Sequence, residues 1–211
     1  MEILGIKIDW LGHAAFKIEK YKKIFIDPYQ LKIKESADII LITHDHFDHC
    51  SIEDINKIAS KETIIIAAEK CKKELEKLKD KVSKIMYVKP NEKLNFEKIA
   101  IETFPSYNIN KNFHPKNSNY VGYIIDIEGI RIYHAGDTDL IDEMKELKVD
   151  IALLPVGGTY TMNYKEAAEA VKLFRPKFAI PMHYGSIVGS EEDAEKFKEL
   201  ASNFSNVIIL K

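Results

Sequence analysis

The chain has 211 residues, of which 45% are hydrophobic and 30% charged, and its 31 basic and 33 acidic side chains leave a formal net charge of −2. This composition excludes an intrinsically disordered chain, and the length suffices for a buried core without disulfide bonds. The balanced charge gives no support to nucleic-acid binding through a bulk positive field. With two cysteines, Cys50 and Cys71, and no apolar run long enough to span a bilayer, we expect a reduced, cytoplasmic protein.

The first half of the chain alternates short apolar runs with helical segments. Within residues 37–42, the continuous apolar run that follows Asp38 predicts a strand that is buried on both faces. Ser51 is the expected N-cap of a short helix that runs to about Ala59. A Lys/Glu-rich amphipathic pattern predicts a second helix at residues 69–79. The remaining strands are expected at residues 3–9, 14–19, 24–27, 63–67, 85–88, 93–96, 99–105 and 120–126.

The second half repeats this alternation. Asn163 is the expected cap of a helix that ends at Phe174, and Glu166 stands where a capping box requires it. We therefore expect one domain, residues 1–211, made of two similar halves at about 1–119 and 120–211. The other elements predicted here are strands at residues 130–134, 151–154, 178–181 and 207–210 and helices at residues 141–147 and 191–201.

Three histidines and two aspartates fall within residues 43–49, directly after the predicted strand that ends at Ile42. Imidazole and carboxylate groups are ligands that suit zinc, manganese and iron. His44 and His46 are two residues apart, so an extended segment points both to one side, and a following turn brings Asp48 and His49 round. A polar surface turn is the alternative interpretation, but it has little need for so many ligating groups. The segment therefore predicts a metal site.

The pattern His44-x-His46-x-Asp48-His49 after a hydrophobic strand resembles the signature of the metallo-β-lactamase-fold hydrolases. Within that superfamily the chain is most similar to small stand-alone metal-dependent hydrolases related to L-ascorbate-6-phosphate lactonase. The resemblance implies an α/β fold, a four-layer αβ/βα sandwich with metals at one edge of two sheets. Further segments that resemble the family follow in its order at residues 11–16, 26–28, 133–138, 153–158, 160–162 and 180–184.

The resemblance also implies two divalent metal ions, zinc first, with manganese or iron as alternatives. Zinc β-lactamases with a thiolate ligand need a cysteine on the second metal, and neither Cys50 nor Cys71 suits that role, so we do not expect antibiotic hydrolysis. The implied ligands are His44 and His46 for the first ion, Asp48, His49 and His183 for the second, and Asp137 as a bridge between the two.

The family pattern breaks at one ligand of the first metal. Relatives normally supply a further histidine just after the strand that corresponds to residues 99–104, but residues 104–108 here read Phe-Pro-Ser-Tyr-Asn. Either His114 folds back to supply the missing imidazole, or the first site is short of a ligand. We favour His114, because three protein ligands hold an ion while leaving an open position. Pro115 would also stiffen the loop of residues 106–119, whose length is typical of functional loops.

Other residues are expected to surround the metals without holding them. Asp48 is the candidate for proton transfer, in addition to its role as a ligand. Asp27 is expected to accept an N–H from a ligand histidine and so fix its tautomer. The remaining candidates are predicted to contact the substrate or a metal ligand, and ordinary packing is the alternative. They are His13, Asp27, Tyr107, His134, Tyr160 and Tyr184.

The predicted reaction is hydrolysis of an ester, lactone or related bond by a hydroxide generated at the metals. The alternatives are a phosphodiesterase or nuclease, and a non-catalytic metal-binding module. The intact His/Asp set argues against the last. We expect a small-molecule substrate and neither a membrane nor a nucleic acid as partner, and we leave homo-oligomerisation open.

Overall fold

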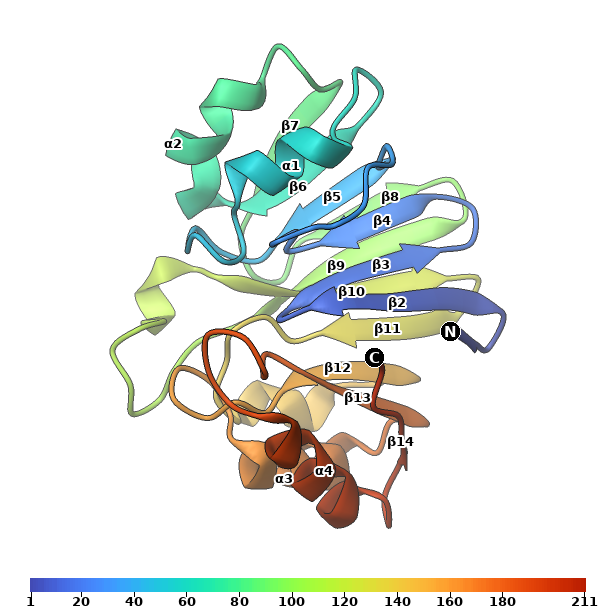
Figure 1. Ribbon diagram of the computed structural model, residues 1–211, viewed down its shortest axis with the longest axis vertical. Coiled ribbons are helices and arrows are strands. Elements are labelled where there is room, and N and C mark those ends of the chain that lie inside the picture. The colour runs from blue at the N-terminus through green and yellow to red at the C-terminus, as the bar shows by residue number, and fades with distance from the viewer. The chain divides into compact units, whose positions relative to one another are not determined.

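The computed structural model describes residues 1–211 and divides by its internal contacts into two compact units, Met1–Lys89 and Pro90–Lys211 (Figure 1). Each unit contains one seven-stranded sheet and its own helices, so the predicted α/β class is confirmed. The sequence-based division into halves near residue 119 stays a prediction.

In the N-terminal unit the strands lie in chain order, from β1 to β7. The pairs from β1 to β4 are antiparallel, and those from β4 to β7 are parallel. All four residues of β5 are buried, which is the environment that its continuous apolar run predicts. The strands are β1 (Glu2–Ile3), β2 (Ile6–Gly12), β3 (Ala15–Glu19), β4 (Lys23–Ile26), β5 (Ile39–Ile42), β6 (Ile64–Ala68) and β7 (Lys84–Val88).

Helix α1 (Ile52–Ile58) is the helix predicted after Ser51, whose side chain accepts a hydrogen bond from the backbone N–H of Asp54. The helix predicted at residues 69–79 is instead three short pieces, η1 (Glu69–Cys71), α2 (Lys72–Leu75) and η2 (Glu76–Leu78). Only Cys71, Leu75 and Leu78 in these pieces are buried. One buried anchor per turn gives little packing to hold a longer regular helix.

The C-terminal unit repeats the plan in reverse order, from β14 to β8. Strands β8 to β11 pair antiparallel, whereas β11 to β14 run parallel. Capping boxes begin both helices of this unit, α3 (Tyr164–Phe174) and α4 (Glu191–Ala201), which pack against each other (Figure 1). The strands are β8 (Lys93–Phe96), β9 (Ile99–Pro105), β10 (Val121–Ile127), β11 (Ile130–His134), β12 (Ile151–Pro155), β13 (Phe178–Met182) and β14 (Asn206–Val207).

Two elements of the C-terminal unit differ from the sequence-based expectation. The helix predicted at residues 141–147 is the 3₁₀ helix η4 (Asp142–Glu146). The buried residue of this helix is Met144, and the residues that flank the helix, Ile141 and Leu147, are buried too, so buried side chains recur every three residues, as three residues per turn require. The strand predicted at residues 207–210 is only the two residues of β14. None of the helices has the length and apolar composition needed to cross a membrane.

Candidate metal centre

The predicted metal ligands of the N-terminal unit lie at one edge of its sheet. His44, His46, Asp48 and His49 occupy the loop that follows β5, and Asp27 directly follows β4. Strands β4 and β5 are parallel neighbours, so their carboxyl ends meet at the same edge. The residues that follow β4 and β5 are therefore close together at this edge.

Asp27 organises this edge. It is fully buried, and its backbone φ of 44° lies in the left-handed region that non-glycine residues rarely adopt. Its carboxylate accepts from the Thr43 N–H at 2.8 Å, the Thr43 hydroxyl at 2.6 Å and Nδ1 of His49 at 2.8 Å. Because Nδ1 of His49 donates to Asp27, its Nε2 carries the lone pair that a metal ion requires.

Thr43 orients His44 in a similar way. The Thr43 hydroxyl gives its hydrogen to Asp27, so its contact of 2.9 Å with Nδ1 of His44 is one in which the histidine donates. This leaves Nε2 of His44 as the ring nitrogen that could bind a metal ion. That atom lies 3.1 Å from Nδ1 of His46, so two ring nitrogens converge on one point.

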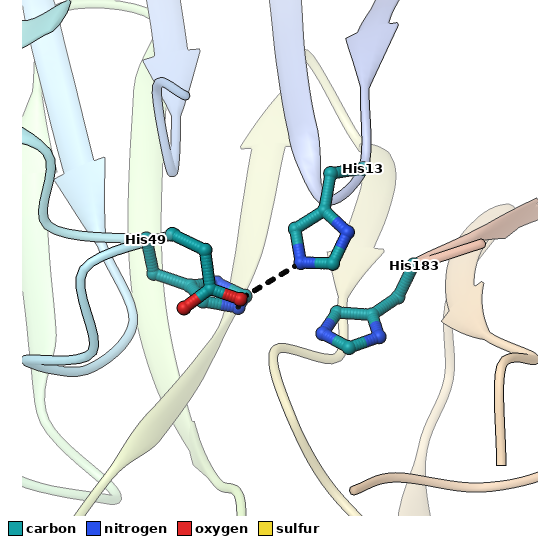
Figure 2. A group of neighbouring side chains, drawn as sticks. His13, His49 and His183 are labelled. Carbon is teal, nitrogen blue, oxygen red and sulfur yellow. Dashed lines mark hydrogen bonds and ion pairs between the residues drawn. The ribbon is translucent and has the colours of Figure 1, made fainter. Parts of the chain in front are cut away.

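His13 and Asp48 form a second group beside His49. His13 lies in the turn between β2 and β3 with a φ of 50°, and its carbonyl accepts from the Trp10 indole at 2.9 Å. Nε2 of His13 lies 3.0 Å from Oδ2 of Asp48 (Figure 2). One ligand atom each of His13, Asp48 and His49 lie within 4.8 Å of one another. The position of His13 beside Asp48 is in line with the contact that the sequence predicted for it.

The C-terminal unit has a cluster of its own around Asp137, which follows β11. Oδ2 of Asp137 lies 3.0 Å from Nε2 of His183 and 3.4 Å from Nε2 of His114. All three side chains are buried. His183 directly follows β13 and has a φ of 59°, so here too a left-handed residue stands at the carboxyl end of a parallel strand.

His114 reaches this cluster because Asn108 folds the loop back. Oδ1 of Asn108 lies 3.0 Å from the backbone N–H of His114 and 3.1 Å from its Nδ1, and the Asn108 N–H donates to the His114 carbonyl at 2.7 Å. The Asn108 amide in turn donates to Asp139 at 3.1 Å and to the Tyr160 carbonyl at 2.9 Å. These bonds engage Nδ1 of His114, and its Nε2 faces Asp137.

Comparison with known proteins identifies the family of this chain. Residues 7–183 match the model of the beta-lactamase superfamily domain. The chain belongs to this superfamily. It is 36% identical to the UPF0173 metal-dependent hydrolase of Pyrococcus furiosus, over 98% of this chain and 96% of that one. The corresponding protein of Thermococcus onnurineus is 38% identical, with the same coverage of both chains.

Solved structures agree with this placement. A candidate metal-dependent hydrolase from Parabacteroides distasonis is 33% identical, with a TM-score of 0.83 over 98% of this chain and 94% of that one. Igni18, a metallo hydrolase from Ignicoccus hospitalis, is 26% identical, with a TM-score of 0.79 over 98% and 95%. The chain therefore has the metallo-β-lactamase fold and is a metal-dependent hydrolase of the β-lactamase superfamily.

The donor set fits this metal dependence. Both clusters offer imidazole nitrogens and carboxylate oxygens, and three of the imidazoles have their other nitrogen engaged by a threonine, aspartate or asparagine side chain. Such anchoring is how proteins orient metal-binding histidines. The mixture of nitrogen and oxygen donors suits transition-metal ions better than calcium or magnesium, which prefer oxygen ligands alone.

The other predicted residues take supporting positions in the superfamily fold. His134 is fully buried in β11 and accepts the Gly136 N–H at 3.2 Å, which shapes the turn before Asp137. The Tyr107 hydroxyl donates to Glu143 at 2.8 Å and accepts from Lys116 at 3.0 Å.

Tyr160 and Tyr184 also pack beside ligand-bearing segments. The Tyr160 ring meets the Phe113 ring edge-on, with a centroid distance of 4.7 Å. Burial, with Glu191 and Glu195 nearby, raises the pKa of Tyr184 to about 12, so its hydroxyl stays protonated at neutral pH.

Three positions with a role in the site escaped the sequence analysis. Thr43 could have been noticed because it directly precedes the first histidine of the motif. Asn108 gave no signal, because its partner His114 is reached only through a loop whose path one sequence does not reveal. Gly157 lies so close to His183 that an added Cβ would stand 2.3 Å from the His183 carbonyl oxygen, so this position requires glycine.

Proposed function

We propose that this protein binds two divalent metal ions and hydrolyses an ester, lactone or related bond of a small molecule. Zinc is the proposed metal, with manganese and iron as alternatives. The observation that carries the proposal is the anchoring of the ligand histidines, because buried partners fix the tautomers that metal binding needs. The proposed ligands are His44, His46 and His114 for the first ion, Asp48, His49 and His183 for the second, and Asp137 for both.

When bound, the ions would lower the pKa of a water molecule to about 7 and polarise the carbonyl group under attack. The chain's own residues prepare this chemistry. Asp27 and Thr43 hold His49 and His44 in the tautomers that leave Nε2 unprotonated. Asp48 is proposed to move the proton of the attacking water, and His13, whose Nε2 lies 3.0 Å from its carboxylate, would stabilise the charge on Asp48.

The proposed substrate is a small molecule rather than a nucleic acid, because the chain has a formal net charge of −2. We prefer a carbonyl compound to a phosphodiester as the substrate because the chain resembles the L-ascorbate-6-phosphate lactonase group. The proposal includes neither a nucleic acid nor a membrane as partner, and the same site would serve a monomer or a homo-oligomer.

The test is a substrate panel on metal-loaded protein, comprising lactones, thioesters, aryl esters and bis(p-nitrophenyl) phosphate. The proposal predicts turnover of at least one carbonyl substrate, loss of that turnover on chelation and its return with zinc or manganese. The Asp48→Asn variant should lower kcat and also weaken binding of the second metal ion, because Asp48 is proposed both to move the proton and to bind that ion. Turnover of the phosphodiester alone would replace the proposed activity with a phosphodiesterase.

A further inference from the structure

Large apolar side chains are exposed beside the metal-ligating segments of both units. The terminal Met1 aside, the three most exposed are Phe47, Ile109 and Phe113, at 69%, 57% and 48%. Phe47 lies between the ligands His46 and Asp48, and Phe113 directly precedes His114. Single exposed apolar residues are ordinary, but their concentration next to a predicted reactive centre is typical of a binding surface.

In the N-terminal unit these residues form a short aromatic row. The Phe47 ring meets the Tyr29 ring edge-on at a centroid distance of 6.0 Å, and the Tyr29 ring meets that of His13 at 5.9 Å. Tyr29 follows Asp27 by two residues, so the row begins at the residues that organise the ligands. Aromatic pairs of this geometry attract one another and hold the exposed ring in place.

In the C-terminal unit the apolar residues stand on a loop that polar bonds fix. The Ile109 N–H donates to Asp139 at 2.9 Å, and Asn108 and His114 bond to each other on either side of the turn. Phe113 packs edge-on against Tyr160. The backbone is therefore held while Ile109 and Phe113 remain exposed, which is how a preorganised binding surface is built.

The cations of this loop are already committed to carboxylates. Lys111 pairs with Asp139 and donates to the Thr161 carbonyl at 3.0 Å. Lys116 pairs with Glu143 at 2.9 Å. The loop of residues 43–51 contains neither lysine nor arginine. Recognition of a phosphate or carboxylate on the substrate normally uses such cations.

We propose that the substrate is uncharged near the scissile bond and carries an alkyl or aryl group that binds to exposed apolar side chains beside the proposed metal ligands, which are Phe47 in the N-terminal unit and Ile109 and Phe113 in the C-terminal unit. The inference rests on the proposed hydrolase function and adds the class of substrate to it. In the reaction one water is consumed, the acyl–oxygen bond breaks, and the products are an acid and an alcohol, or a hydroxy acid from a lactone. A phosphorylated lactone is not the proposed substrate.

The experiment measures kcat/KM for δ-lactones whose alkyl substituent grows from methyl to heptyl, with a phosphorylated lactone alongside. We expect kcat/KM to rise by about threefold to fourfold for each added methylene that is buried. The Phe47→Ser and Phe113→Ser variants should flatten this rise while their metal content stays unchanged. Leu173→Ser and Leu200→Ser are the matched controls, because these leucines are exposed at 43% and 46% on α3 and α4.

A binding measurement separates this inference from the proposed function. Calorimetry of metal-free protein with the corresponding δ-lactams should show affinity that rises with alkyl length and depends on Phe47 and Phe113. If the lactams bind in this way but no lactone or ester is hydrolysed, the proposed function fails, and of the inference only the binding of an alkyl group by these side chains stands. Hydrolysis that is indifferent to alkyl length, or that favours the phosphorylated lactone, overturns the inference alone. An alkyl-length dependence that is unchanged in both serine variants overturns the inference as well, because other residues would then bind the alkyl group.

Discussion

In the N-terminal unit four predicted metal ligands come from six consecutive residues, 44–49, whereas in the C-terminal unit three come from three separate segments of the chain. One buried carboxylate, Asp27, serves the compact motif through Thr43 and His49. The dispersed cluster has no common organiser and depends on a different device for each ligand. These devices are Asn108 for His114, the turn shaped by His134 for Asp137, and the close approach of Gly157 for His183. The residue pattern alone therefore predicts the compact motif, whereas His114, Asp137 and His183 were predicted only through the resemblance to the family.

Asp137→Ala should have the largest effect on activity, because this carboxylate is the proposed ligand shared by both ions and the only carboxylate of its cluster. We expect kcat/KM to fall by well over ~100-fold, beyond the loss typical of a residue that only supports a ligand. His13→Ala, which removes a single imidazole, should cost less. Steady-state kinetics with metal analysis of both variants checks this order, and full activity of Asp137→Ala would show that the bridging assignment is wrong.

Asp27→Asn should weaken metal binding of the compact motif by roughly 10–100-fold, the usual effect of removing a group that orients a metal ligand. An asparagine has a single accepting oxygen, so it cannot accept all the hydrogen bonds that Thr43 and His49 donate to the two oxygens of Asp27. Titration of metal-free protein with zinc in a competing chelator measures the affinity. Asp126→Asn, in a surface turn where Asp126 accepts the Gly129 N–H at 2.8 Å, is the control and should leave zinc affinity unchanged.

Asn108→Ala should weaken the binding of one metal ion by about 10-fold and leave the other unaffected, since Asn108 orients only His114. Asn108→Asp, which keeps an oxygen for the His114 N–H and Nδ1, should restore most of the affinity. The zinc titration that tests Asp27 also distinguishes these variants. Equal weakening of both sites by Asn108→Ala would contradict the view that each dispersed ligand has its own support.

Asp54 should make the N-terminal unit sensitive to acid. Burial alone would raise the pKa of this carboxyl, but bonds from Lys57, Ser51 and the backbone of Leu31 and Gln30 outweigh it and hold the pKa below its ordinary value. The unfolded chain then binds more protons, so this stabilisation is full above about pH 4 and is lost as the pH falls through the folded-state pKa. Asp54→Asn should cost about 1–3 kcal/mol at pH 7 and less at pH 3. Urea unfolding at the two pH values tests this, and an equal cost at both would exclude the ionised carboxylate as the cause.

The sequence predicted what depends on local pattern. The buried strand before His44, the caps at Ser51 and Asn163 and the α/β class are confirmed, because apolar runs and capping residues act over a few positions. The helix predicted at residues 141–147 is the shorter 3₁₀ helix Asp142–Glu146, because pattern alone does not fix the helix type. The support of His114 by Asn108 was not predicted, because it depends on how a loop closes. The His/Asp motif indicates the family, while the substrate depends on side chains that are not part of the ligand pattern, such as Phe47 and Phe113.

Metal content of protein purified without chelators tests the central claim most directly. The account predicts close to two equivalents of zinc, manganese or iron per chain by inductively coupled plasma mass spectrometry. The same protein should lose activity and unfold at lower temperature once a chelator removes the metal, because a bound ion stabilises only the folded state. Protein that carries no metal, and whose melting temperature and activity do not respond to a chelator or to added zinc, would contradict the account.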